Sequence, residues 1–162
     1  MNHWAKALGL SLLLTAAISS RGNVDPLEIP WEQIQKQAAS EGKCLYVAFL
    51  GDGWSVASTR FSKNVLESDA FKEFADKELI YCPILARVQP RMGKKQTARL
   101  QSLVIHFDIM DYPTFILLAP DGNEILRHRY KDVPAEDYLD LIKAILPGQG
   151  DEIEKPADNP TS

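Results

Sequence analysis

The strongest constraint on the fold is the nearly continuous apolar run at residues 44–50, which lies between Gly42 and Gly51. An apolar run of this length between glycines is typical of a strand that is buried on both faces of a parallel sheet. An amphipathic segment at residues 54–66 follows and predicts a helix. Because a sheet that is buried on both faces needs helices on each side, this unit indicates an α/β fold.

The rest of the chain continues the alternation of strands and helices. In chain order we expect a helix at 31–39, the strand at 44–50, a helix at 54–66, a helical piece capped by Ser68, a strand at 79–88, a helix at 94–107, a strand at 114–119, a turn at 120–123, an antiparallel strand at 124–130 and a helix opened by Pro134. The inward sides of the last two helices are expected at Ala98, Leu100, Leu103, Val104 and Phe107, and at Tyr138, Leu141, Ile142 and Ile145. Pro83 removes a ladder donor, so the strand at 79–88 should lie at a sheet edge or carry a bulge.

The two ends of the chain differ in composition from the centre. Residues 1–20 contain Lys6, an apolar stretch at 7–18 and small residues near its end, which is the pattern of a Sec signal peptide. The stretch is shorter than the roughly 20 residues that span a bilayer, so we expect a periplasmic or secreted protein, with an uncleaved N-terminal anchor as the alternative. Residues 21–29 are expected to be a linker and residues 30–146 the folded domain.

The C-terminal residues 147–162 are acidic and rich in proline and glycine, and predict a disordered tail, with an acidic docking peptide as the alternative. The net charge of −4, from 18 basic and 22 acidic residues, carries no signature of nucleic-acid binding. A basic cluster surrounds the start of the helix at 94–107 and consists of Arg87, Arg91, Lys94, Lys95 and Arg99. Such a cluster is usually a solvated face, although an acidic partner or the acidic tail could dock on it.

Two segments of the chain resemble a known family. The first reads Phe49-Leu50-Gly51-Asp52-Gly53-Trp54-Ser55-Val56-Ala57-Ser58, and the second reads Tyr112-Pro113-Thr114-Phe115-Ile116-Leu117-Leu118, with the Asp121-Gly122 turn after it. They resemble the exported bacterial thioredoxin-like proteins, whose first motif is Phe-x-Gly-Ser-Asp-Trp-Cys-x-x-Cys. The resemblance covers residues 30–146. It implies a thioredoxin-like three-layer sandwich with a central mixed four-stranded sheet, flanking helices and a cis-proline at Pro113.

The chain departs from this family at the redox pair itself, where Ser55 and Ser58 match the two cysteines. A serine hydroxyl does not ionise near neutral pH and forms no disulfide, so thiol–disulfide exchange is closed to these positions. Ser55 can equally serve as a helix N-cap. The neighbouring residues 52–53 and 56–57 also differ from the usual pattern, which favours natural divergence over an engineered double substitution.

The resemblance also implies a way for binding to survive without catalysis. In the family, the backbone of the residue before the cis-proline pairs with an extended peptide. We therefore expect a binding surface at Trp54, Ser55, Tyr112, Pro113 and Thr114, occupied by an extended peptide or by another exported or envelope protein. The alternative is that Pro113 merely sets the turn into the sheet while Trp54 packs on Tyr112.

Other chemistries have little support in the sequence. A serine hydrolase needs a histidine base, and His3, His106 and His128 are tied to Ser55 by no motif. No spacing of histidines and carboxylates suggests a metal site, and we expect no cofactor.

The two remaining cysteines, Cys44 and Cys82, fall within predicted neighbouring strands. We expect both to be buried free thiols, because neighbouring parallel strands seldom allow a disulfide. Three functions therefore remain open. The first is a redox-inactive binding module, the second an atypical oxidoreductase that uses Cys44 or Cys82, and the third a structural subunit.

Overall fold

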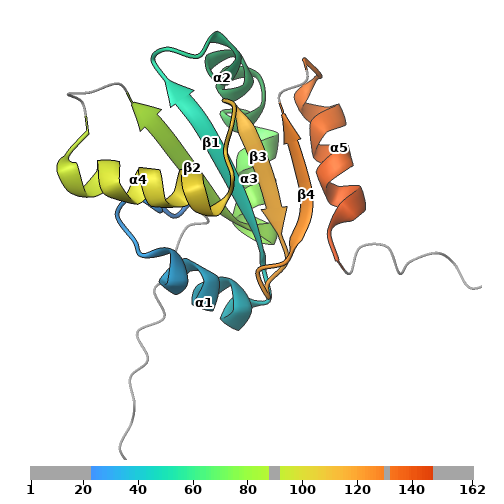
Figure 1. Ribbon diagram of the computed structural model, residues 1–162. Helices are drawn as coiled ribbons and strands as arrows, with labels where there is room; N and C mark the ends of the chain where they lie inside the picture. Colours follow the sequence, from blue (N-terminus) through green and yellow to red (C-terminus); the bar gives the residue numbers. More distant parts are fainter. Residues whose placement is uncertain (1–22, 88–91, 130–131, 148–162) are drawn as a thin grey trace, which may run out of the picture.

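The computed structural model describes residues 23–87, 92–129 and 132–147, and it contains a mixed four-stranded sheet with strand order β2-β1-β3-β4 (Figure 1). The elements are α1 (Trp31–Glu41), β1 (Cys44–Asp52), α2 (Val56–Phe61), a π-helical segment η1 (Ser62–Leu66), α3 (Asp69–Glu78), β2 (Leu79–Arg87), α4 (Lys94–His106), β3 (Thr114–Leu118), β4 (Glu124–Arg129) and α5 (Ala135–Ile145). β1 pairs in parallel with β2 and antiparallel with β3, and β4 is antiparallel to β3. The expected sandwich of helices around a mixed sheet is therefore confirmed.

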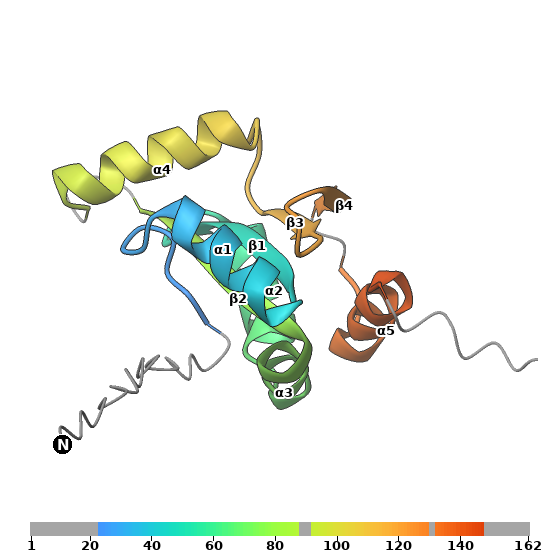
Figure 2. The same cartoon turned by 90° about the horizontal axis from the view of Figure 1, so that it is seen from below.

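The central strand β1 is buried on both faces. Every residue from 44 to 50 is at most 5% exposed. Tyr46, Ala48 and Leu50 belong to the core under α3 and α5, whereas Leu45, Val47 and Phe49 belong to the core under α1 and α4. Figure 2 shows these two helical layers on opposite sides of the strands. The alternation explains why the whole run is apolar, since each side chain enters one of two cores.

The strand β2 lies at a sheet edge, as Pro83 predicts, and its register with β1 is continuous through Pro83. On its outer side, Asn23 forms a parallel bridge with Tyr81, and the Val24 N–H donates to the Tyr81 carbonyl at 2.8 Å. The next step of this pairing would need an N–H at position 83, which proline lacks. Pro83 therefore ends the contact, and the chain turns away toward α1.

The segment before α1 is not a plain linker, which corrects the assignment of residues 21–29. Val24 and Leu27 are 4% and 6% exposed and pack in the core under α1 and α4. The sequence alone gave no sign of this, because two apolar residues in a segment with proline and acidic neighbours form no periodic pattern.

The inward faces of the last two helices also differ from the expectation. Ala98 is exposed, and Leu103 is the residue of α4 that is buried. Leu141 is 49% exposed, and Leu139 takes its place beside Tyr138 and Ile142.

The rotation of α5 follows from a buried polar chain. The Tyr138 hydroxyl is hydrogen-bonded to the hydroxyl of Tyr46 and lies 2.6 Å from His128 Nε2. The ring of His128 stacks on Phe115 at 4.9 Å, so this histidine is half-buried and not on an outward face of its strand. Burial raises the pKa of both tyrosines, so both stay neutral and must be satisfied by hydrogen bonds.

Candidate functional site

The site is built where β1 runs into α2, at the upper end of the sheet in Figure 1. The chain turns at Gly53, whose φ of 80° favours glycine, and Ser55 then adopts an extended conformation before the first residue of α2. Gly51 allows this turn to close, because a Cβ there would lie 2.7 Å from both the Ser55 Cβ and the Trp54 ring. The helix expected from residue 54 therefore begins at Val56.

The hydroxyl oxygens of both serines accept hydrogen bonds from backbone N–H groups. Ser55 Oγ accepts the N–H of Ser58 at 3.2 Å, so the expected N-cap is confirmed. Ser58 is 2% exposed, and its Oγ accepts the N–H of Gly51 at 3.0 Å. The Ser55 hydroxyl also points toward the Tyr112 carbonyl at 3.5 Å, which is a long contact. The pair therefore stabilises the strand–helix junction.

The loop between α4 and β3 lies against this junction and contains a cis peptide bond between Tyr112 and Pro113. The Tyr112 ring packs edge-on against Trp54 with centroids 5.3 Å apart, and Trp54 Nε1 donates to the Ala86 carbonyl at 2.8 Å. Thr114 Oγ1 donates to the Asp111 carbonyl at 2.7 Å.

The structure thus brings the five expected binding residues together, while their role in binding stays a prediction. Pro113 and Thr114 are buried, and Ser55 is 9% exposed. Trp54 is 49% exposed and Tyr112 is half-buried, so these two supply the accessible side chains. Trp54 packs on Tyr112, as the alternative above expects, and its ring nevertheless stays partly exposed.

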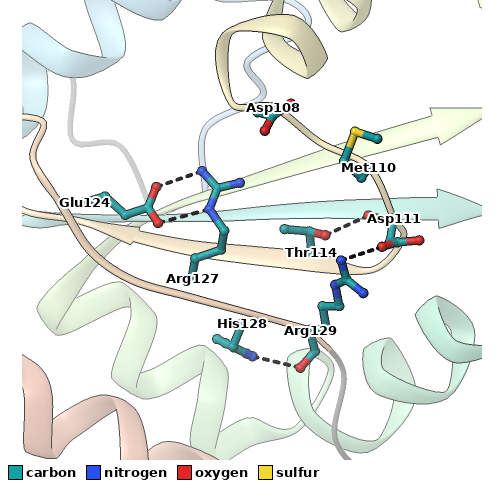
Figure 3. Close-up of a pocket in the computed structure, with 8 residues that line it drawn as sticks. All are labelled: Asp108, Met110, Asp111, Thr114, Glu124, Arg127, His128 and Arg129. Carbon is teal, nitrogen blue, oxygen red and sulfur yellow. Dashed lines mark hydrogen bonds and ion pairs between the residues drawn. The ribbon is translucent and has the colours of Figure 1, made fainter.

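Two hollows are lined by residues of the strand–helix junction and of the loop before β3. The first, which we call the helix pocket, has a volume of about 390 Å³ and is lined by Gly53, Trp54, Ser55, Val56, Thr59 and Arg60. The second, which we call the strand pocket, has a volume of about 780 Å³ and is lined by Asp108, Met110, Asp111, Thr114, Glu124, Arg127, His128 and Arg129 (Figure 3).

The guanidinium groups of the strand pocket already have partners. Arg127 forms two hydrogen bonds with Glu124, at 3.0 and 2.7 Å, and donates to the Phe107 carbonyl at 2.7 Å. Arg129 pairs with Asp111 at 2.7 Å, as the dashed line in Figure 3 shows. These contacts attach the loop that carries Tyr112 to the edge strand β4, and they leave little positive charge for an anionic ligand.

The two cysteines lie away from this site and are free thiols, as expected. Cys82 is paired in register with Val47, three residues along from Cys44. Cys44 and Cys82 also belong to different cores, on opposite faces of the sheet, so their side chains point apart. Burial raises the pKa of both thiols and keeps them protonated near neutral pH.

Two of the arginines in the basic cluster have partners within the described residues. Arg87 pairs with Asp52 at 2.7 Å, and Arg99 donates to the Leu27 carbonyl at 2.8 Å. Lys94 and Lys95 are exposed, and Arg91 lies outside the described residues. Arg87 and Arg99 therefore attach β2 and α4 to their neighbours.

Within the described residues, neither Ser55 nor Ser58 is hydrogen-bonded to a histidine that could act as a base. His106 is exposed at the end of α4, and His128 contacts Tyr138 and the Arg129 carbonyl.

His3, the expected signal peptide at 1–20 and nearly all of the expected tail at 147–162 lie outside the described residues. Among the residues that are described, no group of three or more histidine, cysteine or acidic side chains is placed to hold a metal ion. Within that same part of the chain, the helices are too short or too polar to cross a bilayer.

Sequence reasoning missed the contacts that hold the site in place. The Trp54–Ala86 hydrogen bond and the Asp52–Arg87 and Asp111–Arg129 ion pairs join residues that are far apart along the chain. One signal was available for the Asp52–Arg87 pair, since a parallel register that starts at residues 44 and 79 places them opposite each other.

Several solved structures have a similar backbone. An oxidoreductase named DsbH superposes with a TM-score of 0.66 at 16% identity, covering 71% of this chain and 80% of that one. A thioredoxin from Thermus thermophilus gives 0.54 at 16% identity, covering 75% and 87%. The C-terminal domain of DsbD from Neisseria meningitidis, in the oxidised form, gives 0.52 at 14% identity, covering 71% and 92%.

Comparisons by sequence add no family, since no protein-family model and no curated protein matches the chain. Identities this low establish architecture but not activity. The strand order, the cis-proline beside the start of α2 and the structural neighbours agree with one another, and we conclude that this chain has the thioredoxin-like fold.

Proposed function

We propose that this protein is a redox-inactive binding module that holds an extended segment of another exported or envelope protein at Trp54, Ser55, Tyr112, Pro113 and Thr114. The observation that carries the proposal is the state of the two serines. They stand where the resemblance places a redox cysteine pair, and their hydroxyls are hydrogen-bonded to backbone groups at the head of α2. Oxygen at these positions cannot exchange electrons with a disulfide.

The surroundings of the serines support binding. Trp54 stays half-exposed although its indole N–H is anchored, so an aromatic face is held in a fixed position at the surface. Within the described residues, the Tyr112 N–H has no hydrogen-bond partner and the Tyr112 carbonyl has only the long contact with Ser55. A main-chain edge of this kind can pair with an extended polypeptide.

The first test is turnover of insulin disulfides with dithiothreitol as reductant. We expect the protein to give no rate above the uncatalysed reaction, because neither serine can form a thiolate. The double variant S55C/S58C is the positive control, since it places thiols at the head of a helix, where the macrodipole stabilises a thiolate. Turnover by the unaltered protein would refute the proposal.

Burial argues against the competing oxidoreductase that would use Cys44 or Cys82. The two sulfur-bearing side chains are 5% and 0% exposed, and their raised pKa values leave little thiolate at pH 8. We expect an aromatic disulfide reagent to label no thiol in the folded protein and two thiols in denaturant. Rapid labelling of either cysteine in the folded protein would favour the alternative function, an oxidoreductase that uses Cys44 or Cys82.

We also propose that the protein acts after export, because residues 1–20 have the charge and apolar pattern of a signal peptide. Intact mass measurement of the protein recovered from a Gram-negative host tests this directly. Loss of about the first 20 residues supports export with cleavage. Retention of the whole N-terminus would favour the uncleaved anchor.

A further inference from the structure

The polar chain between α5 and the sheet has a fixed direction of hydrogen-bond donation. His128 Nδ1 lies 3.1 Å from the Arg129 carbonyl, which can only accept, so Nδ1 carries the proton of the neutral ring (Figure 3). Nε2 is then an acceptor and takes the O–H of Tyr138 at 2.6 Å. The Tyr138 oxygen in turn accepts the O–H of Tyr46. In this arrangement every O–H and ring N–H of the chain has an acceptor.

A positive charge on His128 would reverse this direction. Both nitrogens of a protonated ring donate, so Nε2 would give its hydrogen bond to the Tyr138 oxygen. The Tyr138 O–H would then turn toward Tyr46, and the Tyr46 O–H would need another acceptor. Tyr46 is 0% exposed, and Tyr138 is its only hydrogen-bond partner within the described residues. Because a buried O–H without an acceptor is costly, the folded protein opposes protonation of His128.

The surroundings of the ring oppose the charge as well. The imidazole of His128 is half-buried and stacks on Phe115 with centroids 4.9 Å apart. On the α5 side, Phe61 packs edge-on against Tyr138, also at 4.9 Å. Burial among aromatic rings removes water that would otherwise solvate a charged imidazole, so the neutral form is favoured.

The charged groups near His128 are already compensated by one another. Those that line the strand pocket with it are Asp108, Asp111, Glu124, Arg127 and Arg129. Glu124 pairs with Arg127, and Asp111 with Arg129, both at 2.7 Å, while Asp108 helps to raise the pKa of the Arg127 guanidinium. These carboxylates therefore add little attraction for a third positive charge.

The remaining elements around the chain contribute no charge that would favour a protonated ring. β1 and α5 contribute Tyr46 and Tyr138, and burial raises the pKa of both, so they are neutral. In the segment between β4 and α5, Asp132 pairs with Arg60 of α2 at 3.7 Å.

We infer that His128 acts as an acid-sensitive latch that holds α5 to the sheet. While the ring is neutral, the directed chain connects α5 with β1 and β4, and a proton on Nε2 breaks this connection. The unfolded chain binds the proton more readily than the folded protein does. Stability is therefore fully present above the ordinary histidine pKa of about 6.5 and is lost as the pH falls below it. The inference is independent of the proposed binding function.

Urea unfolding of the full chain at about pH 7.5 and about pH 5 tests the latch, with H128Q for comparison. Glutamine can accept the Tyr138 O–H but takes up no proton, and carboxylates that titrate in this range affect both proteins alike. On acidification, we expect the equilibrium constant for unfolding to rise about tenfold more in the unaltered protein than in H128Q. H106Q is the matched control and should behave like the unaltered protein, because His106 is exposed at the end of α4.

Two measurements on the unaltered protein need no variant. Long-range proton–nitrogen NMR spectra of the histidine rings at neutral pH should show the His128 proton on Nδ1 and none on Nε2. Hydrogen exchange, corrected for its intrinsic dependence on pH, should show that acid lowers the protection of α5 more than that of α4, which packs on the other face of the sheet.

Each opposite result overturns the inference. An equal pH dependence in H128Q and in the unaltered protein would show that His128 does not cause the acid sensitivity. A proton on Nε2 at neutral pH contradicts the direction of donation. Equal loss of protection in α5 and α4 would show that acid acts on the whole fold and not on one helix. If H128Q does not fold, the NMR and exchange measurements decide.

Discussion

At the scale of single residues, the two serines stabilise the junction between β1 and α2. Ser55 has taken the role that a serine performs well, accepting a backbone N–H at the head of a helix. Ser58 satisfies the N–H of Gly51 at the end of the strand, in a place that is almost completely buried. A buried N–H without an acceptor is costly, so each hydroxyl contributes to stability.

We expect S55A to lower the free energy of unfolding by about 1 kcal/mol, the usual contribution of an N-cap. S55D should keep most of the stability, because a carboxylate also accepts the Ser58 N–H. Urea unfolding measures both. S102A is the control, since Ser102 is exposed within α4 and caps no helix. A loss in S102A as large as that in S55A would show that the effect is not a matter of capping.

At the scale of elements, α5 is fixed to the sheet by polar as well as apolar contacts. The linked hydroxyls of Tyr46 and Tyr138, together with His128 Nε2, connect β1, α5 and β4 through a region from which water is excluded. Such a chain specifies the rotation of the helix, because turning α5 by one residue would break it. Apolar packing alone would have accepted Leu141 as readily as Leu139.

Removing both hydroxyls of this chain should cost less stability than the sum of the two single removals. We expect Y138F to lower the free energy of unfolding by about 1–3 kcal/mol, because the fully buried Tyr46 hydroxyl then loses its partner. The double variant Y46F/Y138F should lose clearly less than the sum of the two single variants. Urea unfolding of the four proteins checks this, and strict additivity would show that the two hydroxyls do not act as a pair.

At the scale of the whole molecule, the folded unit begins before α1. Val24 and Leu27 are buried in the core under α1 and α4, and the bridge between Asn23 and Tyr81 covers part of the edge of β2. The region that the sequence assigned to a linker therefore contributes to both core packing and edge protection.

Two truncated chains test this boundary. We expect residues 21–147 to unfold at the same denaturant concentration as the full chain, since the described packing is complete within them. A chain of residues 30–147 should lose about 3 kcal/mol or more, because two buried aliphatic side chains are removed. Equal stability of the two truncated chains would show that residues 23–29 only rest on the surface.

Local pattern predicted the elements well, because periodicity and turn residues act over short distances. The run at 44–50, the capping serines at 55 and 68 and the Asp121-Gly122 turn each carry their own signal. Pro83 predicted an edge strand or a bulge, and β2 lies at the edge. The meeting of Trp54 with Tyr112 came from the resemblance and not from periodicity. Contacts such as Arg129 with Asp111 had no local signal at all, because each partner is an ordinary surface residue in its own segment.

The sequence by itself determined that a doubly buried strand leads into a helix capped by Ser55, since side-chain chemistry and backbone preference are local properties. Tertiary structure alone decided which faces were buried, that Cys44 and Cys82 point into opposite cores, and that Trp54 packs against Tyr112. The reason is physical, because burial, register and ion pairing are properties of segments after they have packed, and no single segment carries them alone.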